Sequence, residues 1–393
     1  MDHESALKAQ EHGDEERRER DIAASEVTSV PVEQTPSTVE EEYHEEEEEE
    51  EPLRRPEPVF LFIEPVVASL VLFSMLGVLV RIYLTRLFTY HGTPIYALIW
   101  TQMLGCLVMG VATRTKGVLL RLSPALNLGV TTGLCGSITT FSSWQLLVFT
   151  QFFNTARDGH SHFRNFLGGM SVLVTTLACS VGALRMGQML GDEARLLCGV
   201  YLRHRGDTIF RVDTGMLGGG PPAEGRGWRE WRTTDHILSV AGTVGVCAAC
   251  VVVGLATRTR SVSIALLFGP VGTMVRWRLA ALNTKHIRCA FGLPLGTFTA
   301  NVVGSLVLAI VHILQTGVVV RPSQASCYVL QAVADGFCGC LTTISTFVAE
   351  IHVLSSRRSI IYAVLSVVVT QAFFILIPGI YFKTADVDYN VCL

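Results

Sequence analysis

Long stretches that are almost free of charged residues constrain the fold of this chain more than any other feature. A membrane-spanning helix needs ~20 mostly apolar residues, and the stretches have about this length. Because only 17% of the 393 residues are charged, the chain could not coat several soluble domains with polar side chains. We predict an all-α integral membrane protein with nine transmembrane helices. The nine ranges are residues 59–80, 94–112, 124–150, 166–184, 237–257, 261–283, 293–317, 326–352 and 359–381.

Three sequence motifs occur twice and in the same order. Residues 133–144 and residues 336–347 both contain Gly-x-Cys-Gly followed by Thr-Thr. The other two pairs are Gly77-x-x-x-Arg81 with Gly272-x-x-x-Arg276, and Gln102-x-x-Gly105 with Asn301-x-x-Gly304. These pairs predict two four-helix units joined by the fifth span, and the odd number of intervening spans inverts the second unit relative to the first.

This architecture divides the chain into six parts. The N-terminal tail includes an unbroken glutamate run at residues 45–51, which is typical of a disordered, solvated segment. We expect an acidic cytoplasmic tail at 1–57, a first repeat at 58–190, a cytoplasmic loop at 191–235, a linker helix at 236–257, a second repeat at 258–382 and a C-terminal tail at 383–393.

The Gly-rich segments followed by Thr-Thr lie in the middle of the third and eighth spans. They predict helices that are broken at bilayer depth, where the freed backbone groups must face protein or an ion. A single hydroxyl in a span usually joins two helices, but clustering beside a break in both repeats favours an ion site. The clustered side chains are Thr139, Thr140, Ser142, Ser143, Thr342, Thr343, Ser345 and Thr346, with Gln102 and Asn301 on neighbouring spans.

The chemistry of these groups suits an anion. Hydroxyls and amides donate hydrogen bonds, and aromatic rings present a positive edge. Carboxylates are nearly missing from the span centres, so a proton-coupled transporter is less favoured, and the sequence offers no nucleophile with a base for an enzyme. Cys247 and Cys250 have no partner pair at zinc spacing. We expect neither an organic cofactor nor a nucleic-acid partner.

The loop charges predict the orientation. With the N-terminus in the cytoplasm, most of the loop arginines and lysines lie on the cytoplasmic side, including those in the loop at 191–235. We therefore expect the C-terminus to be extracellular.

At these residues the chain resembles a known family. Gly339-x-x-Thr342-Thr343-x-Ser345-Thr346-Phe347, Asn301-x-x-Gly304-Ser305 and Gly269-x-x-Gly272-x-x-x-Arg276 look like the motifs of the fluoride channel family called CrcB or Fluc. The tandem form is similar to the eukaryotic fluoride export proteins of fungi. The resemblance covers residues 59–381 and implies a single chain equivalent to the antiparallel bacterial homodimer, in the plasma membrane.

The resemblance also implies a structural sodium ion and two sets of pore residues. The sodium ligands would be the backbone carbonyls of Gly136, Thr139, Gly339 and Thr342. The family has two pore phenylalanines per unit, and here these positions hold Phe141 and Trp144 in the first unit and Ile344 and Phe347 in the second. If each pore takes one aromatic from each unit, Phe141 and Phe347 complete one pore, and Trp144 and Ile344 leave the other vestigial.

Further site residues follow from the same resemblance. Asn301 would be the pore asparagine, and Gln102 its counterpart in the vestigial pore. Tyr362 and Ser366 would line the conducting pore together with Thr343, Ser345 and Thr346. Arg81 and Arg276 would have a vestibule or structural role.

The implied function is passive, fluoride-selective export through one pore. The membrane potential would expel the anion at ~2.3 kcal/mol per charge per 100 mV. Two alternatives remain at this point: a secondary transporter of another small ion or solute, and a membrane scaffold without transport.

Overall fold

The computed structural model describes residues 65–155, 159, 161–204, 227–255, 260–283, 292–316, 322–381 and 392. The chain divides into two units, Met1–Pro58 and Val59–Leu393, and all described residues belong to the second. The predicted acidic tail at 1–57 lies outside the described residues, as do residues 205–226 of the predicted loop.

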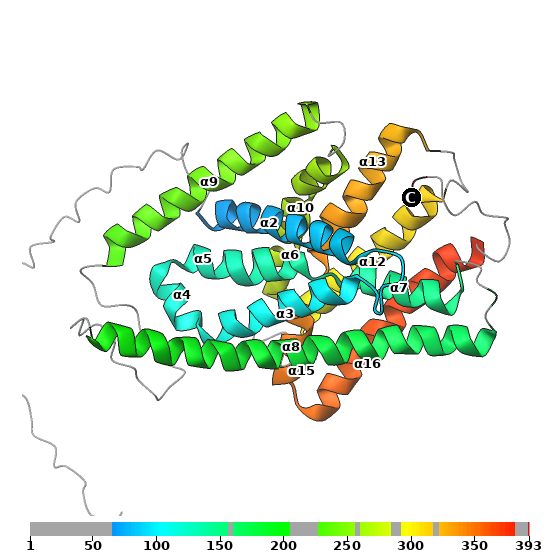
Figure 1. Ribbon diagram of the computed structural model, residues 1–393, viewed down its shortest axis with the longest axis horizontal. Helices are drawn as coiled ribbons and strands as arrows, with labels where there is room; N and C mark the ends of the chain where they lie inside the picture. The colour runs from blue at the N-terminus through cyan, green and yellow to red at the C-terminus, as the bar shows by residue number, and fades with distance from the viewer. Residues whose placement is uncertain are drawn as a thin grey trace, which may run out of the picture. The chain divides into compact units, whose positions relative to one another are not determined.

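The described residues form helices and connecting turns, without a strand (Figure 1). The helices of the first half precede α9, and those of the second half follow it. The helices of the first half are α2 (Pro65–Phe88), α3 (Leu98–Arg114), α4 (Lys116–Leu122), α5 (Pro124–Leu128), η1 (Gly129–Cys135), α6 (Gly136–Ile138), α7 (Phe141–Phe152) and α8 (His162–His204). After α9 (Gly227–Leu255) follow α10 (Arg260–Leu279), η2 (Ala280–Asn283), α12 (Leu295–Gln315), α13 (Gln324–Ala332), η3 (Val333–Cys338), α14 (Gly339–Leu341), α15 (Ser345–Val353), α16 (Ser356–Phe374) and η4 (Ile375–Gly379).

Six helical segments within the described residues are long and apolar enough to cross a membrane. A seventh is present if α3 and α4, which meet at a bend of 76°, form one span. The predicted count of nine is therefore not confirmed. The range 124–150 divides into short pieces at a break, and α10 carries Arg276 and Arg278 in its last turn, which lowers its mean hydropathy.

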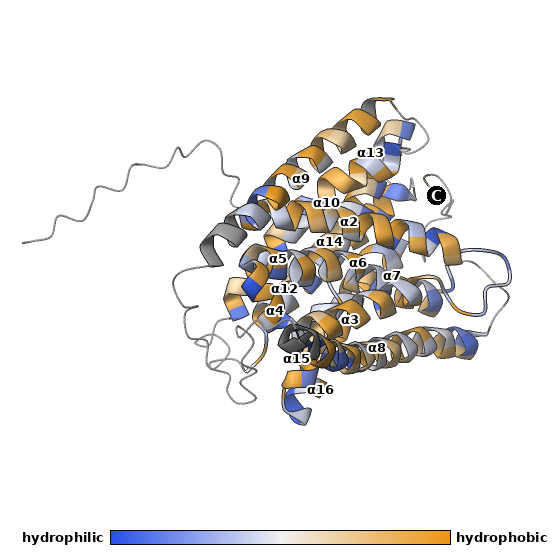
Figure 2. Ribbon diagram, turned by 60° about the vertical axis from the view of Figure 1, so that its left-hand side comes forward, coloured by the Kyte–Doolittle hydropathy of each residue, from blue (hydrophilic) through white to orange (hydrophobic). Residues whose placement is uncertain are grey.

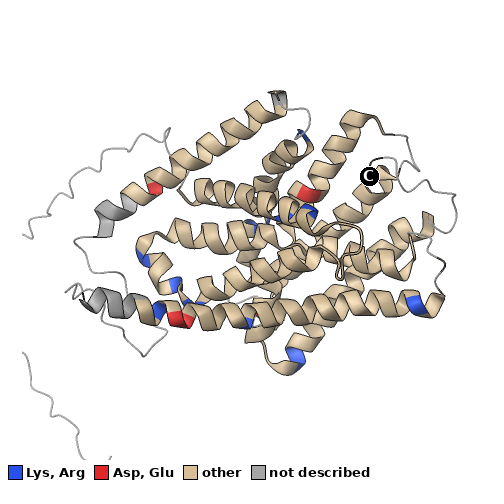
Figure 3. Cartoon of the chain, viewed as in Figure 1, with Lys and Arg blue, Asp and Glu red and all other residues tan. Residues whose placement is uncertain are grey.

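Apolar side chains face outward on the long helices. Val174 on α8, Val251 on α9 and Val368 on α16 are each more than half exposed. Figure 2 shows apolar residues along most of the helices, and Figure 3 shows few charged residues on them. Exposed apolar faces on helices of this length are stable in lipid rather than in water, so the chain is an integral membrane protein.

The two halves pack in the same way. In the first half α2 contacts η1 and α3 contacts α8, and in the second half α10 contacts η3 and α12 contacts α16. The helices α2 and α10 also contact each other, so the halves meet directly along the first helix of each (Figure 1). The short helices α6 and α14 contact each other and are completely buried, so the interrupted helices meet where the two halves pack together.

The repeated glycines explain how the neighbouring helices approach these interruptions. A Cβ at Gly105 on α3 would collide with the methyl group of Thr139, and a Cβ at Gly304 on α12 would collide with the methyl group of Thr342. Only glycine lets each helix lie this close to the interrupted one. The glycines of the motifs Gln102-x-x-Gly105 and Asn301-x-x-Gly304 therefore allow the same close approach to the interrupted helix in both halves.

Candidate functional site

Both predicted helix breaks are present. In the first half α6 ends at Ile138, Thr139 and Thr140 are extended with ψ angles of 147° and 123°, and α7 begins at Phe141. In the second half α14 ends at Leu341, and Thr342 is extended with a ψ angle of 152°. The π-helical segments η1 and η3 precede the two breaks, and such segments are frequent at functional sites.

Each break supplies a hydroxyl that caps the helix of the other half. Thr139 Oγ1 accepts hydrogen bonds from the backbone N–H groups of Ile344 at 3.3 Å and Ser345 at 3.1 Å. Thr342 Oγ1 accepts one from the N–H of Ser142 at 3.1 Å. Because the first N–H groups of a helix have no partner within it, these threonines satisfy donors that lipid could not.

The remaining hydroxyls at the breaks join the two halves. Thr343 Oγ1 lies 3.1 Å from Thr139 Oγ1 and 3.2 Å from Ser345 Oγ, and all three side chains are fully buried. Thr140 Oγ1 lies 3.1 Å from Thr342 Oγ1. The structure thus brings together the predicted hydroxyl residues of the two halves, with Thr346 and Ser143 at half-buried positions beside them.

The two amide side chains bind the extended backbone of the breaks. Gln102 donates from Nε2 to the Thr140 carbonyl at 2.7 Å and accepts from the Thr140 N–H at 3.2 Å. Asn301 makes the same pair of contacts with Thr343, at 3.3 Å and 2.9 Å. Gln102 and Asn301 therefore replace the backbone hydrogen bonds that the break removes. The pore-lining role of Asn301 stays a prediction.

Arg81 and Arg276 are buried between the two breaks, with 4% and 5% of their surface exposed. Arg81 Nη1 donates to the carbonyls of Ser137 and Gly339, each at 2.7 Å. Arg276 Nη1 donates to Gly136 O at 2.7 Å and Thr342 O at 3.4 Å. Each arginine thus binds carbonyls from both halves, which supports the structural alternative of the two predicted roles.

The carbonyls expected to hold sodium are part of this network. Gly136, Gly339 and Thr342 each accept a guanidinium hydrogen bond. A carbonyl oxygen has a second lone pair that suits a hard cation, but in the structure two positively charged guanidinium groups occupy these oxygens, so the sodium site stays a prediction. Among the described residues no group of three or more His, Cys, Asp or Glu could hold a metal ion.

The predicted pore aromatics meet in one buried cluster. The rings of Phe141 and Phe347 contact edge to face with centroids 5.2 Å apart, and the Phe347 ring lies 5.0 Å from the ring of Tyr362. Trp144 and Ile344 belong to the same hydrophobic cluster. The Trp144 ring also lies 5.3 Å from Phe141, and its Nε1 donates to the carbonyl of Val172 on α8 at 3.3 Å.

Several polar residues beside this cluster were not predicted as site residues from the sequence. Thr370 continues the series of Tyr362 and Ser366 on α16 at the same four-residue spacing, and this spacing could have identified it. Gln145 on α7 is fully buried and contacts α16 through Gln371. Gln145 and Gln371 could have been identified as candidates because each is a polar residue inside an apolar span.

A carboxylate also lies near the cluster. Glu350 accepts hydrogen bonds from Tyr362 at 2.9 Å, Thr297 at 2.6 Å and Asn283 at 3.1 Å. It is near the end of the predicted span 326–352, where a charge is least costly. Its contact with Tyr362 depends on α16, and the sequence of α15 alone contains no sign of it.

A cavity of about 500 Å³ opens onto the first break. Its lining includes Arg81, Thr140 and Ser143, and also the disulfide-bonded pair Cys327 and Cys392. The cavity therefore connects hydroxyls of the site with the residue next to the end of the chain.

Two stretches of the chain match one protein family, and most of the chain is similar to known proteins. Residues 68–188 and 263–380 match the family described as CrcB-like protein, Camphor Resistance (CrcB). The chain is 30% identical to Fluoride export protein 1 of Candida albicans, with 82% of each chain covered. It is 27% identical to Fluoride export protein 1 of Saccharomyces cerevisiae, over 81% of this chain and 94% of the relative.

A shorter bacterial relative matches part of the chain. Fluoride-specific ion channel FluC 1 of Nocardia farcinica is 37% identical over 28% of this chain and 71% of its own length. No solved structure matches the chain. The two matched stretches together cover more than half of the sequence and coincide with the two halves that pack alike. The chain therefore belongs to the CrcB-like family.

Proposed function

We propose that this chain is a passive, fluoride-selective channel that exports fluoride from the cytoplasm. The observation that carries the proposal is the pair of helix breaks, which pack against each other beside the edge-to-face pair Phe141 and Phe347. The fungal and bacterial relatives are named for fluoride export and fluoride-specific conduction, and this suggests the ion. The sequence contains no Walker-type phosphate-binding loop, and export down the electrochemical gradient needs none.

We propose a single functional pore formed by Phe141, Phe347 and the hydroxyl side of α16. Phe347 joins Phe141 to Tyr362, so aromatic edges and hydroxyl groups follow one another along one path. The other two positions differ: Trp144, the counterpart of Phe347 in the first half, bonds to α8, and Ile344, the counterpart of Phe141 in the second half, offers no aromatic edge. This difference between the halves favours one conducting pore and one vestigial pore.

The architecture we propose is two inverted four-helix repeats joined by α9. The matched packing of the halves and the two matches to one family support a duplication. The third and eighth spans are then the interrupted helices, and α10 is a span whose charged last turn lies at the membrane surface. With these segments the number of spans is nine.

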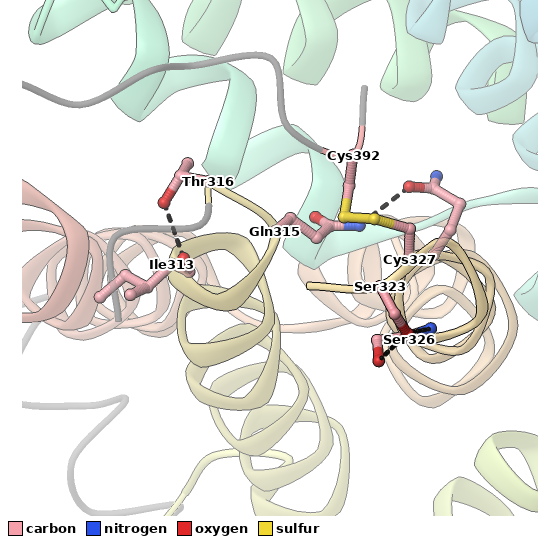
Figure 4. The surroundings of a disulfide bond; sticks show 8 residues. Ile313, Gln315, Thr316, Ser323, Ser326, Cys327 and Cys392 are labelled. Atoms are coloured by element: carbon pink, nitrogen blue, oxygen red, sulfur yellow. Dashed lines mark hydrogen bonds between the residues drawn. A yellow bond between two sulfur atoms is a disulfide. The ribbon is translucent and has the colours of Figure 1, made fainter. Parts of the chain in front are cut away.

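We place the N-terminus in the cytoplasm and the C-terminus outside the cell. Besides the loop charges, a disulfide between Cys327 at the start of α13 and Cys392 supports this orientation (Figure 4). Disulfides persist in oxidising compartments, so the membrane face that carries this pair is the extracellular one, in accord with the plasma membrane. The cavity lined by Cys327 and Cys392 is then an outer vestibule.

Labelling of cysteines tests this orientation. Treatment of intact cells with a membrane-impermeant reductant followed by an impermeant maleimide should label wild type. The Cys392→Ser variant should be labelled without reductant, because Cys327 is then free. Labelling of wild type only in inside-out vesicles would contradict the proposed orientation.

The decisive test of the function is fluoride efflux from liposomes that contain the purified chain, measured with a fluoride electrode. We expect rapid efflux of fluoride and no comparable efflux of chloride, because a path lined by closely packed aromatic edges and hydroxyl groups favours the smaller anion. Efflux should follow the membrane potential set by a potassium gradient and require no proton gradient. Equal permeability to both halides would refute the assignment.

We further propose a sodium ion that shares the carbonyls of Gly136, Thr139, Gly339 and Thr342. When bound, it would add a positive charge that links the two breaks, while Arg81 and Arg276 orient the same carbonyls. A second arm of the efflux experiment replaces sodium with N-methyl-D-glucamine throughout purification. We expect lost efflux and a lower melting temperature, and unchanged behaviour would exclude an ion at this position.

A further inference from the structure

Gln145 presents a buried amide N–H group that has no partner among the described residues. Its side chain is fully buried, and its Nε2 atom lacks a hydrogen bond. Gln145 follows Phe141 by four residues on α7, so the two side chains lie on one face of that helix. An unpaired donor at such depth is costly, so this N–H group is a candidate to bind a water molecule or an anion.

The contacts of the amide oxygen fix which way the group points. Gln371 Nε2 donates to Gln145 Oε1 at 2.9 Å and to the Gln145 carbonyl at 2.8 Å, and Thr370 Oγ1 lies 3.4 Å from Oε1. Exchanging the oxygen and nitrogen of Gln145 would turn its N–H groups toward the N–H groups of Gln371. The acceptor oxygen of Gln371, Oε1, is also buried without a hydrogen bond, so the two donors of Gln145 do not reach it in the structure.

The hydroxyls near Gln145 have already used their protons. Ser366 Oγ donates to the carbonyl of Tyr362 at 2.7 Å, and Thr370 Oγ1 donates to the carbonyl of Ser366 at 2.7 Å. These bonds to the preceding turn leave the hydroxyls as acceptors toward the helix interface. Gln145 Nε2 differs from these hydroxyls, because its N–H groups have no partner among the described residues.

The corresponding position in the second half lacks such a donor. Trp144 and Phe347 occupy equivalent positions in the two halves, and they are followed directly by Gln145 and Val348. Val348 is therefore the counterpart of Gln145. Val348 is fully buried in the same hydrophobic cluster as Phe141 and Phe347. At this position of the interrupted helix, therefore, only the first half carries an amide.

We propose that Gln145 Nε2 is an anion-binding donor that coordinates fluoride next to Phe141 in the conducting pore. The inference rests on the proposed function and adds a specific ligand residue to it. Fluoride is small and strongly hydrated, so a dehydrated ion needs compact donors, and an N–H bond to an ion is roughly twice as strong as one between neutral groups. The amide, held at its oxygen by Gln371, offers two such donors.

Two substitutions of Gln145 in the full-length chain test the proposal. Gln145→Val introduces the residue that the second half carries at this position, and Gln145→Met keeps the length of the side chain without a donor. The matched control is Gln315→Leu, which removes another buried glutamine whose Nε2 donates to Gln331 at 2.9 Å. Each protein is reconstituted in liposomes after it elutes as a single peak.

We expect fluoride efflux to fall about tenfold or more in both Gln145 variants, as the loss of a hydrogen bond to an ion predicts, and to change little in the control. A second readout is the melting temperature in sodium fluoride compared with sodium chloride. Wild type should be stabilised specifically by fluoride, and the Gln145 variants should lose this difference even where their melting temperature in chloride is unchanged.

The outcomes separate this inference from the proposed function. The role of Gln145 alone is overturned if wild type conducts fluoride and a well-folded Gln145→Val or Gln145→Met variant matches it. The match must hold both for efflux and for the fluoride-specific stabilisation. Absence of a fluoride-specific shift in wild type would also count against a bound ion here. A wild-type protein that conducts no fluoride would refute both.

Discussion

The Phe347→Ile variant is expected to abolish fluoride efflux, whereas the Trp144→Ile variant is expected to conduct. Phe347 contacts both Phe141 and Tyr362, so its ring edge is the link between the aromatic pair and the hydroxyls of α16. We expect efflux to fall by about 100-fold or more, the change that ~3 kcal/mol of lost stabilisation of the ion would produce.

The comparison with Trp144 separates conduction from packing. Both side chains are almost completely buried, and replacing tryptophan with isoleucine removes more volume than replacing phenylalanine. Trp144→Ile should therefore destabilise the protein at least as much as Phe347→Ile, because it also removes the bond to the Val172 carbonyl. If flux nevertheless falls only in the Phe347 variant, the loss arises from the pore rather than from instability.

Fluoride efflux from liposomes and the melting temperature in detergent are the two measurements. An Ile344→Phe variant adds a third comparison, because it restores the aromatic that the second half lacks. We expect no gain from this change alone, since Trp144 still bonds to α8. Equal losses of efflux in the Phe347 and Trp144 variants would contradict the assignment of one conducting pore.

Replacing Arg276 with methionine should prevent stable folding. The guanidinium group donates to carbonyls of Gly136, Thr132 and Thr342, which belong to both halves. Methionine leaves these buried carbonyls without a donor, and breaking a buried charged contact costs ~3–5 kcal/mol. Arg276→Lys should be almost as harmful, because one ammonium group cannot reproduce the branched geometry of a guanidinium.

Arg278 provides the matched control. It lies on the same helical turn of α10, but it is exposed and stands over the Trp277 ring at 5.2 Å. Arg278→Met should leave the melting temperature nearly unchanged. Size-exclusion profiles and thermal unfolding in detergent measure the difference, and a monodisperse Arg276→Met protein with the wild-type melting temperature would contradict the central role of this side chain.

The sequence predicted the helix breaks because their signal is local. Glycines followed by Thr-Thr inside an apolar stretch are inconsistent with an uninterrupted helix in lipid, and the structure is extended at Thr139 and at Thr342. The motif occurs in both halves, so the same break is predicted twice. By contrast, the number of spans depends on whether a helix with charged residues in its last turn is counted as a span. The helix α10, with two arginines there, is such a case.

Contacts between distant segments could not be predicted in this way. Arg81 follows a glycine motif on α2, but its bond to Gly339 joins residues that lie in different halves of the chain. The pairing of Gln145 with Gln371 and of Glu350 with Tyr362 likewise depends on how α16 packs. Sequence patterns identify polar residues in a span, and the tertiary fold decides which carbonyl or amide each of them meets.

The exchange of hydroxyl caps between the breaks has a consequence for how the two halves change over evolutionary time. Thr139 caps the helix that begins near Ser345, and Thr342 caps the helix that begins near Phe141. A mutation at either threonine therefore weakens the opposite half, and gene duplication does not free it to vary. The side chains of Trp144 and Ile344 cap no helix of the opposite half, so these two positions can differ between the halves without leaving a helix uncapped.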